Sequence, residues 1–290
     1  MTLHVVDGTF EIFRAHFSKR PEHNRPDGKP FKATGGLVSS LLALLSDSKE
    51  HVTHLAVAFD NPIRSFRNDL FEGYKSDVGI DPDLRAQFDD AEEATRALGI
   101  TVWSMDRWEA DDALASAAWR WGREVPVRIL SPDKDLGQCL AWPGVTQVDR
   151  IRERVIDAAT LRAVRGVDPD CIPDLLGLIG DDADGIPGLP GWGDKSASTV
   201  LARWRHIDAI PADPARWDVK VRGADKLAAT LAARRDDALL YRDLATLVHD
   251  VPLPESLDDL KWRGAPRARF HAWCDTAGLG RLKERPTAWL

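Results

Sequence analysis

Apolar residues gather in short runs along the first half of the chain, and most runs are rich in β-branched side chains. Each run is bounded by polar residues, Gly or Pro, which is typical of buried strands. The predicted strands cover residues 3–6, 54–59, 101–103, 127–130 and 145–148. Helical periodicity predicts helices over residues 34–47, 83–98, 109–121 and 133–140. This alternation predicts an α/β fold, with a mostly parallel central sheet flanked by helices.

The remaining segments are two loops and a helical second half. Residues 19–32 contain Pro, Gly and charged residues, and are predicted to form an exposed loop. Residues 61–82 mix Arg, Lys, Phe and Tyr without one clean period. After about residue 165 the strand signal fades, and short helices punctuated by Gly and Pro follow. We therefore expect an α/β core over 1–165 and a helical second lobe over 166–290.

The composition is that of an ordinary globular protein, with 290 residues, 43% hydrophobic and 29% charged. Cys139, Cys171 and Cys274 lack CxxC spacing, which argues against a disulfide framework or thiolate zinc site and favours a cytoplasmic location. No signal peptide or long apolar run is present, so no membrane association is expected. The net charge of -7 argues against a nucleic-acid partner, unless many acids converge on divalent cations.

Acidic residues follow directly on three predicted strands. Asp7 ends the first, Asp60 ends the second, and Asp133 and Asp135 follow the fourth within SPDKD. Because ligands of open α/β sheets bind at the carboxyl ends of the strands, we expect these acids to gather at one edge. Turn chemistry explains each acid singly, but together they would repel one another unless cations neutralised them. An all-oxygen ligand set favours Mg²⁺ or Mn²⁺ over zinc.

Two further motifs are acidic. They supply Glu109, Asp111 and Asp112 in WEADD, and Asp181, Asp182 and Asp184 in GDDADGIPG. Positions 109 and 112 share one face of the predicted helix, although acids in a first turn also suit the helix dipole. The second motif directly precedes a glycine-rich turn, and by its spacing alone a solvated loop explains it too.

The glycine-rich turn GLPGWGDKS covers residues 188–196. It approaches a phosphate-binding loop, but no strand precedes it and an Asp separates Gly193 from Lys195. What remains is a Gly-x-x-Gly-x-Gly turn that opens a helix, where backbone N–H groups approach a phosphate closely. It would bind a DNA backbone without reading bases. A plain helix cap is the alternative.

A basic and aromatic segment covers residues 64–75, where Arg64, Arg67 and Lys75 alternate with Phe66, Phe71 and Tyr74. Aromatic side chains beside cations suit a DNA single strand through base stacking and phosphate contact. An amphipathic helix with Phe66 and Leu70 packed inward explains the same letters.

In order and approximate spacing, the chain resembles the 5′ nuclease domain of bacterial DNA polymerase I and its stand-alone flap endonuclease relatives, over roughly residues 3–280. The resemblance rests on VDG, VAFD, FRNDLFEGYKSD, EADD, SPDKD and GDDADGIPGLPGWGDKSA. It implies a PIN-like catalytic core over 1–165 with an arch at 61–82, then a helix-three-turn-helix DNA-binding subdomain and a C-terminal helical segment over 166–290. The implied activity is a structure-selective 5′ nuclease of DNA replication and repair, with flap endonuclease and 5′-3′ exonuclease activity. Two metal ions would hydrolyse phosphodiesters to 5′-phosphate and 3′-hydroxyl ends.

The resemblance also implies roles for individual residues. The first metal would be held by Asp7, Asp60, Glu109 and Asp111, with Asp112 adjacent. The second would be held by Asp133, Asp135 and Asp181, sharing Asp111, with Asp184 in its outer shell. Lys75 and Arg14 match basic catalytic positions, alongside Asp7, Asp60 and Asp111. DNA would be bound by Tyr74, Arg67, Gly188, Gly191, Gly193, Lys195 and Ser196.

The resemblance also has implications for a bound ion and for partners, and the chain departs from the family pattern at one position. The glycine turn would hold a K⁺ ion through backbone carbonyls. Many relatives have an arginine three residues after the arch lysine, where this chain has Val78, and Arg85 is the candidate substitute. No polymerase sequence follows, so we expect a separate, monomeric polypeptide. It would act on DNA with 5′ flaps, nicks or 5′ ends, and its candidate partner is a polymerase or ligase.

Two other functions compete with this interpretation. A non-catalytic DNA-structure binding module could use the glycine turn, but the full set of acids argues against it. A phosphatase with Asp7 as nucleophile would need a second acid at position 9, where the chain has Thr9.

Overall fold

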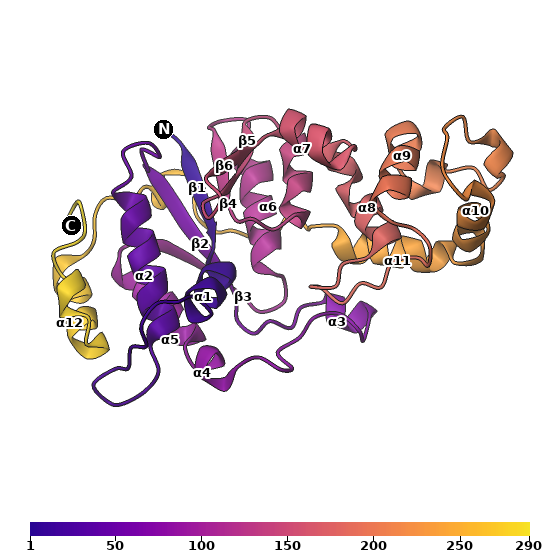
Figure 1. Ribbon diagram of the computed structural model, residues 1–290. Coiled ribbons are helices and arrows are strands. Elements are labelled where there is room, and N and C mark those ends of the chain that lie inside the picture. The colour runs from indigo at the N-terminus through magenta and orange to yellow at the C-terminus, as the bar shows by residue number, and fades with distance from the viewer.

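A computed structural model describes residues 1–290 and contains a six-stranded sheet of order β3-β2-β1-β4-β5-β6 (Figure 1). The strands are β1 (Leu3–Asp7), β2 (His54–Asp60), β3 (Thr101–Met105), β4 (Val127–Leu130), β5 (Val145–Asp149) and β6 (Arg154–Ile156). Strands β1 to β5 are parallel, and β6 runs antiparallel to β5. The mostly parallel sheet and all the predicted strands are confirmed, whereas the short edge strand β6 was not predicted.

The helices cover both faces of the sheet and form the second lobe. The α-helices are α1 (Gly8–His16), α2 (Lys32–Leu45), α3 (Arg67–Leu70), α4 (Pro82–Arg85), α5 (Phe88–Ala97), α6 (Ala110–Trp121), α7 (Ala158–Arg165), α8 (Ile172–Ile179), α9 (Asp194–Trp204), α10 (Ala224–Ala233), α11 (Arg235–Ala245) and α12 (Arg267–Ala277). Short 3₁₀ helices cover Asp135–Ala141, Pro169–Cys171, Ile207–Ala209, Pro214–Arg216, Asp258–Leu260 and Gly280–Leu282.

The helix predictions had mixed outcomes. The helices predicted at 34–47 and 109–121 are confirmed as α2 and α6. The segment at 133–140 forms a 3₁₀ helix instead of an α-helix. The single helix predicted at 83–98 is wrong, because α4 ends before Gln87, whose side-chain oxygen accepts a hydrogen bond from the backbone of Thr34 at 3.1 Å. Helix α1 was not predicted.

Alternating side chains of the strands pack into two cores. Val57 and Phe59 of β2 point to the face covered by α2 and α5. Ala56 and Ala58 point to the opposite face, which α6 covers. This second core continues without a break into α8, α9 and α11, so buried apolar contact joins the sheet to the helical lobe. The carboxyl edge of the sheet and the helical lobe are therefore held together.

The chain ends against the α/β core rather than against the helical lobe. Helix α12 lies at the far side of the α/β core from α9 and α10 (Figure 1). Its residues Phe270 and Cys274 belong to the core that contains Leu37 and Phe88. The boundary between the two predicted domains, at residues 165 and 166, stays a prediction. The C-terminal segment belongs to the core on the face of the sheet that α2 and α5 cover. None of the helices is both long and apolar enough to cross a membrane.

Candidate active site

The first group of carboxylates lies where the strand order reverses, beside β1. Asp7 and Asp60 are the last residues of the parallel strands β1 and β2. One oxygen of Asp7 accepts a hydrogen bond from Phe10 N at 2.7 Å, and the other accepts one from Ser131 Oγ at 2.9 Å. Asp60 Oδ1 accepts from Ala110 N at 2.7 Å. These bonds tie the ends of β1 and β2 to the start of α6 and to the loop after β4, as the sheet topology predicts.

The start of α6 brings two more acids to this edge. Glu109 is the N-cap of α6, and its side chain accepts hydrogen bonds from Ser65 Oγ at 2.6 Å and Tyr74 OH at 3.2 Å. Asp111 lies in the first turn, and its buried Oδ1 has no hydrogen-bond partner. A buried carboxylate oxygen without a donor is costly, so this atom indicates a ligand position.

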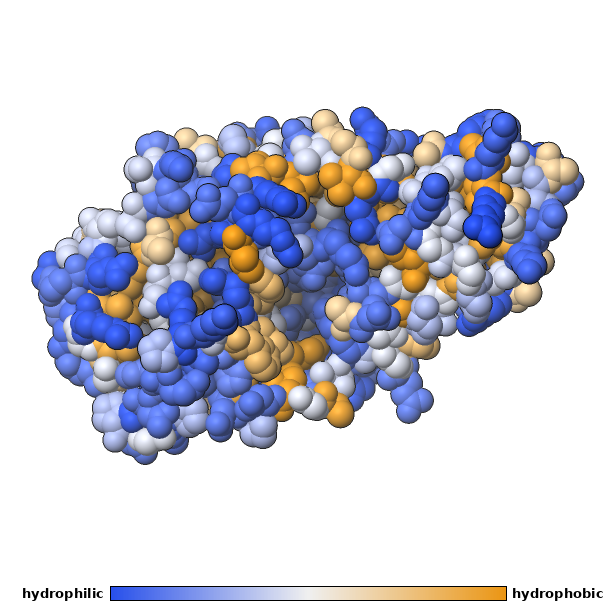
Figure 2. Space-filling view, viewed as in Figure 1, coloured by the Kyte–Doolittle hydropathy of each residue, from blue (hydrophilic) through white to orange (hydrophobic).

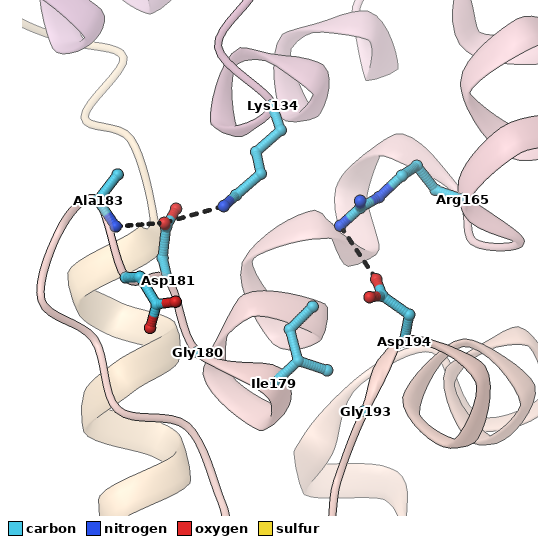
Figure 3. A pocket seen from close by; sticks show the side chains of 9 residues that line it. Lys134, Arg165, Ile179, Gly180, Asp181, Ala183, Gly193 and Asp194 are labelled. Atoms are coloured by element: carbon cyan, nitrogen blue, oxygen red, sulfur yellow. Dashed lines mark hydrogen bonds and ion pairs between the residues drawn. The ribbon is translucent and has the colours of Figure 1, made fainter.

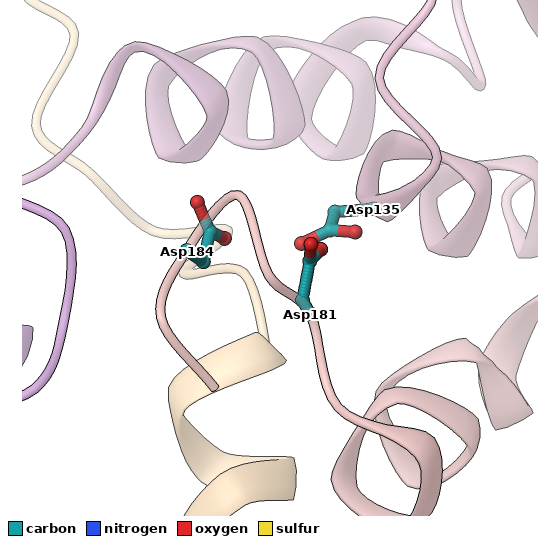
Figure 4. A group of neighbouring side chains, drawn as sticks. All are labelled: Asp135, Asp181 and Asp184. Atoms are coloured by element: carbon teal, nitrogen blue, oxygen red, sulfur yellow. The ribbon is translucent and has the colours of Figure 1, made fainter. Parts of the chain in front are cut away.

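The second group of carboxylates joins the loop after β4 to the loop after α8. Asp133 follows β4, and one oxygen each of Asp135, Asp181 and Asp184 lies within 4.8 Å of the others (Figure 4). Asp135 Oδ1 is buried and has no hydrogen-bond partner. Asp184, which we expected further out, shares this group.

The packing of these acids changes their protonation. Burial raises the pKa of Asp7 to about 7 and that of Asp60 to about 6. Burial and the charge of Asp133 raise the pKa of both Asp111 and Asp135 well above the usual value. Such crowding of like charge is unfavourable unless cations or protons compensate it. With two unpartnered oxygens, this donor set fits divalent cations held by oxygen ligands.

Lys75 lies between the two groups of carboxylates. Its Nζ is 2.9 Å from Glu109 Oε2 and 3.0 Å from Asp184 Oδ1. These partners outweigh burial and raise the pKa of Lys75 well above its usual value. Backbone contacts also join the segment after α3 to the loop after α8. Lys75 N donates to Asp184 O at 3.0 Å, and Gly185 packs directly on Gly73 O. The predicted catalytic lysine is thus at the acids.

Arg67 has a structural role, and the prediction that it contacts DNA is wrong. Its side chain is fully buried, and its two terminal nitrogens donate to Asp112 at 2.8 and 2.7 Å. Asp112 also accepts from the backbone of Glu109 and Val248. Both oxygens of Asp112 are therefore occupied, so the prediction that it adds to the metal ligands is wrong too.

Tyr74 is not available for stacking on DNA, contrary to prediction. It is only 4% exposed, and its hydroxyl points at Glu109 and Asp184. The predicted catalytic Arg14 bonds to neither group of carboxylates. Its guanidinium donates to Glu11 and to Ser40 Oγ at 3.1 Å instead.

The two residues at the predicted departure from the family lie outside the carboxylate groups. Val78 is 91% exposed. Arg85 pairs with Asp77 at 3.2 Å instead of with either group of carboxylates, so its predicted role as the substitute arginine is not supported.

The glycine turn lies in the helical lobe and opens α9. Gly188 and Gly191 have φ of 66° and 86°, in the left-handed region that favours glycine. A Cβ on Gly188 would also meet the backbone of Gly180 at 2.4 Å. Gly193 is the N-cap of α9 and donates its N–H to Ser196 Oγ at 3.0 Å, while Lys195 is exposed without an ion pair. The K⁺ site stays a prediction.

Three residues that contact the acids were not predicted from the sequence. Ser131 and Ser65 orient Asp7 and Glu109. Ser131 is the first residue of SPDKD, whereas Ser65 has no recognisable motif. Lys134 pairs with Asp181 at 2.9 Å. Its position inside SPDKD, between two predicted ligands, was the signal available.

Figure 2 shows a hollow with hydrophilic residues between the two halves of the molecule on this face.

Acids at the switch point of a parallel sheet, together with a glycine turn in an adjoining helical lobe, are the arrangement expected of a metal-dependent nuclease. The chain matches the family described as 5′-3′ exonuclease, N-terminal resolvase-like domain, over residues 2–165. It matches the description 5′-3′ exonuclease, C-terminal SAM fold, over residues 167–268. The chain belongs to the 5′-3′ exonuclease family.

Individual relatives agree with this assignment. The 5′-3′ exonuclease of Aquifex aeolicus is 30% identical over 262 residues, which cover 90% of this chain and 86% of that protein. DNA polymerase I of Rhizobium leguminosarum is 36% identical over 265 residues, which cover 89% of this chain and 26% of the polymerase. The chain thus spans between a quarter and a third of the length of the polymerase relatives that it matches.

Solved structures show the same fold. The bacteriophage T5 5′-exonuclease with bound zinc has a TM-score of 0.66 at 19% identity, covering 98% of this chain and 100% of that chain. The catalytic core of Rad2 in complex with DNA has a TM-score of 0.58 at 16% identity, covering 96% and 86%.

Proposed function

We propose that this chain is a structure-selective 5′ nuclease that hydrolyses DNA phosphodiesters at or near 5′ ends, in DNA replication and repair. The observation that carries the proposal is the pair of carboxylate groups, in which the buried oxygens Asp111 Oδ1 and Asp135 Oδ1 have no protein partner. The names of the relatives support it, since they include an exonuclease of similar length and a T5 flap endonuclease solved with DNA and metal ions. Products would carry 5′-phosphate and 3′-hydroxyl ends.

The two groups would hold two Mg²⁺ or Mn²⁺ ions. Asp7, Asp60, Glu109 and Asp111 would hold the first. Asp133, Asp135, Asp181 and Asp184 would hold the second. When bound, such ions supply an activated water and stabilise the charge that develops on the scissile phosphate. Both unpartnered oxygens would then gain a ligand, and the repulsion among the acids would fall.

The protein groups around these acids fix and tune them. Ser131 and Ser65 orient Asp7 and Glu109 through short hydrogen bonds. The Lys75 ammonium group would move from Glu109 and Asp184 to the scissile phosphate. A cation at this position stabilises the transition state more than the ground state. Val78 stands where many relatives have an arginine, so that position adds no cation to the one that Lys75 supplies.

The glycine turn would bind duplex backbone without reading sequence. Lys195 and the N-terminus of α9 border a groove of about 510 Å³, which Lys220 and Arg222 also line. Backbone N–H groups at the turn and these cations suit phosphate oxygens. We also propose a K⁺ ion at this turn, a monomeric and cytoplasmic protein, and a polymerase or ligase as its partner.

The test is digestion of matched flap, nicked, blunt and single-stranded DNA, each labelled at the 5′ end, in EDTA, Mg²⁺, Mn²⁺ or Ca²⁺. We expect cleavage in Mg²⁺ and Mn²⁺, preference for a flap or nick, and binding with little turnover in Ca²⁺. Tight flap binding without cleavage in any cation would instead identify a non-catalytic binding module. Equal cleavage in EDTA would refute the role given to the acids.

A further inference from the structure

Lys134 is a cation placed among the acids of the second group. It follows Asp133 and precedes Asp135, and its Nζ lies 2.9 Å from Asp181 Oδ1 (Figure 3). The lysine side chain is 43% exposed, while that of Asp181 is 4% exposed. The ammonium group thus reaches the buried acid from the solvent side.

Asp181 Oδ1 has a second donor, because it also accepts the N–H of Ala183 at 3.0 Å. The same carboxylate belongs to the group in which one oxygen each of Asp135, Asp181 and Asp184 lies within 4.8 Å. Asp135 Oδ1, buried and unpartnered, is an independent sign that this group takes a ligand. A divalent cation and an ammonium group on one carboxylate repel each other, so each weakens the binding of the other.

A second basic side chain, that of Arg165, lines the pocket beside Lys134. A pocket of about 430 Å³ lies between the acids and the start of α9, lined by Lys134, Arg165, Gly193 and Asp194 among others (Figure 3). Arg165 pairs with Asp194 at 3.6 Å across this pocket. A DNA backbone that joins the carboxylates to the glycine turn would pass this pocket.

We propose that Lys134 is a positioning residue that competes with the second divalent cation for Asp181, and that its displaced ammonium group then binds a DNA phosphate in the adjoining pocket. The inference rests on the proposed function for the identity of the phosphate ligand. It makes cation loading and DNA binding favour each other, since both draw Lys134 away from Asp181.

The experiment measures Mn²⁺ binding to the full chain without DNA, by electron paramagnetic resonance titration, and flap DNA affinity in Ca²⁺ by fluorescence anisotropy. Lys134→Met should bind the weaker Mn²⁺ ion about tenfold more tightly, which corresponds to removal of one competing contact. It should also bind flap DNA several-fold more weakly. Lys134→Arg keeps the charge and the hydrogen bond, and should stay near wild type in both measurements.

Two controls separate direct competition from a general change in charge. Arg165→Met removes one positive charge from the same pocket but leaves Asp181 untouched, so it should weaken DNA binding without tightening Mn²⁺ by more than about twofold. In an Asp181→Asn background, Lys134→Met should no longer tighten Mn²⁺.

An unchanged or weaker Mn²⁺ affinity of Lys134→Met would overturn the inference. An equal gain in Arg165→Met, or a gain that persists in the Asp181→Asn background, would overturn it as well, since either result shows a long-range field effect. If the Mn²⁺ results hold but the wild-type chain cleaves no DNA, Lys134 still competes with the cation, and the proposed nuclease function is the part that fails.

Discussion

Replacing Arg67 tests whether this residue belongs to the fold or to the DNA interface. Its guanidinium forms two hydrogen bonds to Asp112, at 2.8 and 2.7 Å. It also donates to Leu244 O at 2.8 Å and to Thr246 O at 2.9 Å. These bonds fix the start of α6, whose N-cap is Glu109, to the end of α11 and the residue after it. We expect Arg67→Met to fold with much lower stability.

The magnitude follows from what the substitution leaves behind. The introduced thioether side chain would fill part of the volume, but Asp112 would stay buried with an unpaired charge, and two backbone carbonyls would lose their donors. Removing one partner of a buried ion pair costs about 3 to 5 kcal/mol. For a chain of this size each kcal/mol lowers Tm by about 2 to 4 °C, so the expected drop is about 6 to 20 °C.

The assay is thermal unfolding followed by circular dichroism, with duplex affinity measured well below the transition. Arg64→Met is the matched control, because Arg64 pairs with Asp69 on the surface, and it should change stability by less than about 0.5 kcal/mol. Arg67→Met combined with Asp112→Asn should recover part of the loss, since the unpaired charge is gone. If Arg67→Met melts within about 2 °C of wild type but binds DNA tenfold more weakly, the structural role is refuted and the DNA contact is restored.

Three further predictions concern the site and its charge. Lys75→Ala should slow single-turnover cleavage by about a hundredfold to a thousandfold at saturating Mg²⁺, with flap affinity in Ca²⁺ changed less than about tenfold; a near-wild-type rate would assign the role to another cation. Lys195→Ala should weaken unrelated duplexes about equally and make the salt dependence shallower by roughly one phosphate contact; an effect on one sequence alone would contradict this. Because the folded pKa values of Asp7, about 7, and Asp60, about 6, exceed the usual 3.8, the folded state retains these protons more tightly. In EDTA their contribution to stability should therefore be fully present below about pH 4 and fall as pH rises through 7; Asp7→Asn should show a smaller loss of Tm between pH 5 and 8, and an unchanged loss would contradict the assignment.

The sheet and the position of the acids were predictable because both depend on local patterns. Short β-branched runs identified the strands, and parallel strands align their carboxyl ends whatever the loops do. Asp7 and Asp60 therefore had to lie at one edge. The acids of α6 were added to this group because a triple acid in the same small α/β domain would need cations to neutralise it. Those of the loop after α8 were grouped with it only through the resemblance, because a loop carries no signal of its tertiary neighbours.

The buried, structural role of Arg67 could not be predicted from its neighbours in the sequence. Its partners Leu244 and Thr246 are 177 and 179 residues away, and the same letters suit an exposed DNA contact. Gln87 gives a similar case, since its bond to Thr34 accompanies the break between α4 and α5. Long-range polar contacts of this kind override local propensity.

We propose above all that the two groups of carboxylates bind the cations of a 5′ nuclease. The most direct measurement is single-turnover cleavage of a 5′-labelled flap over a Mg²⁺ titration, for wild type and Asp111→Asn, with flap affinity in Ca²⁺ measured in parallel. Asp111 Oδ1 is buried and unpartnered, so its replacement removes a ligand while leaving the packing largely intact. We predict no wild-type cleavage without Mg²⁺, and a loss of at least about a hundredfold in Asp111→Asn while the flap still binds. Cleavage by Asp111→Asn at the wild-type rate and with the same Mg²⁺ dependence would contradict the account.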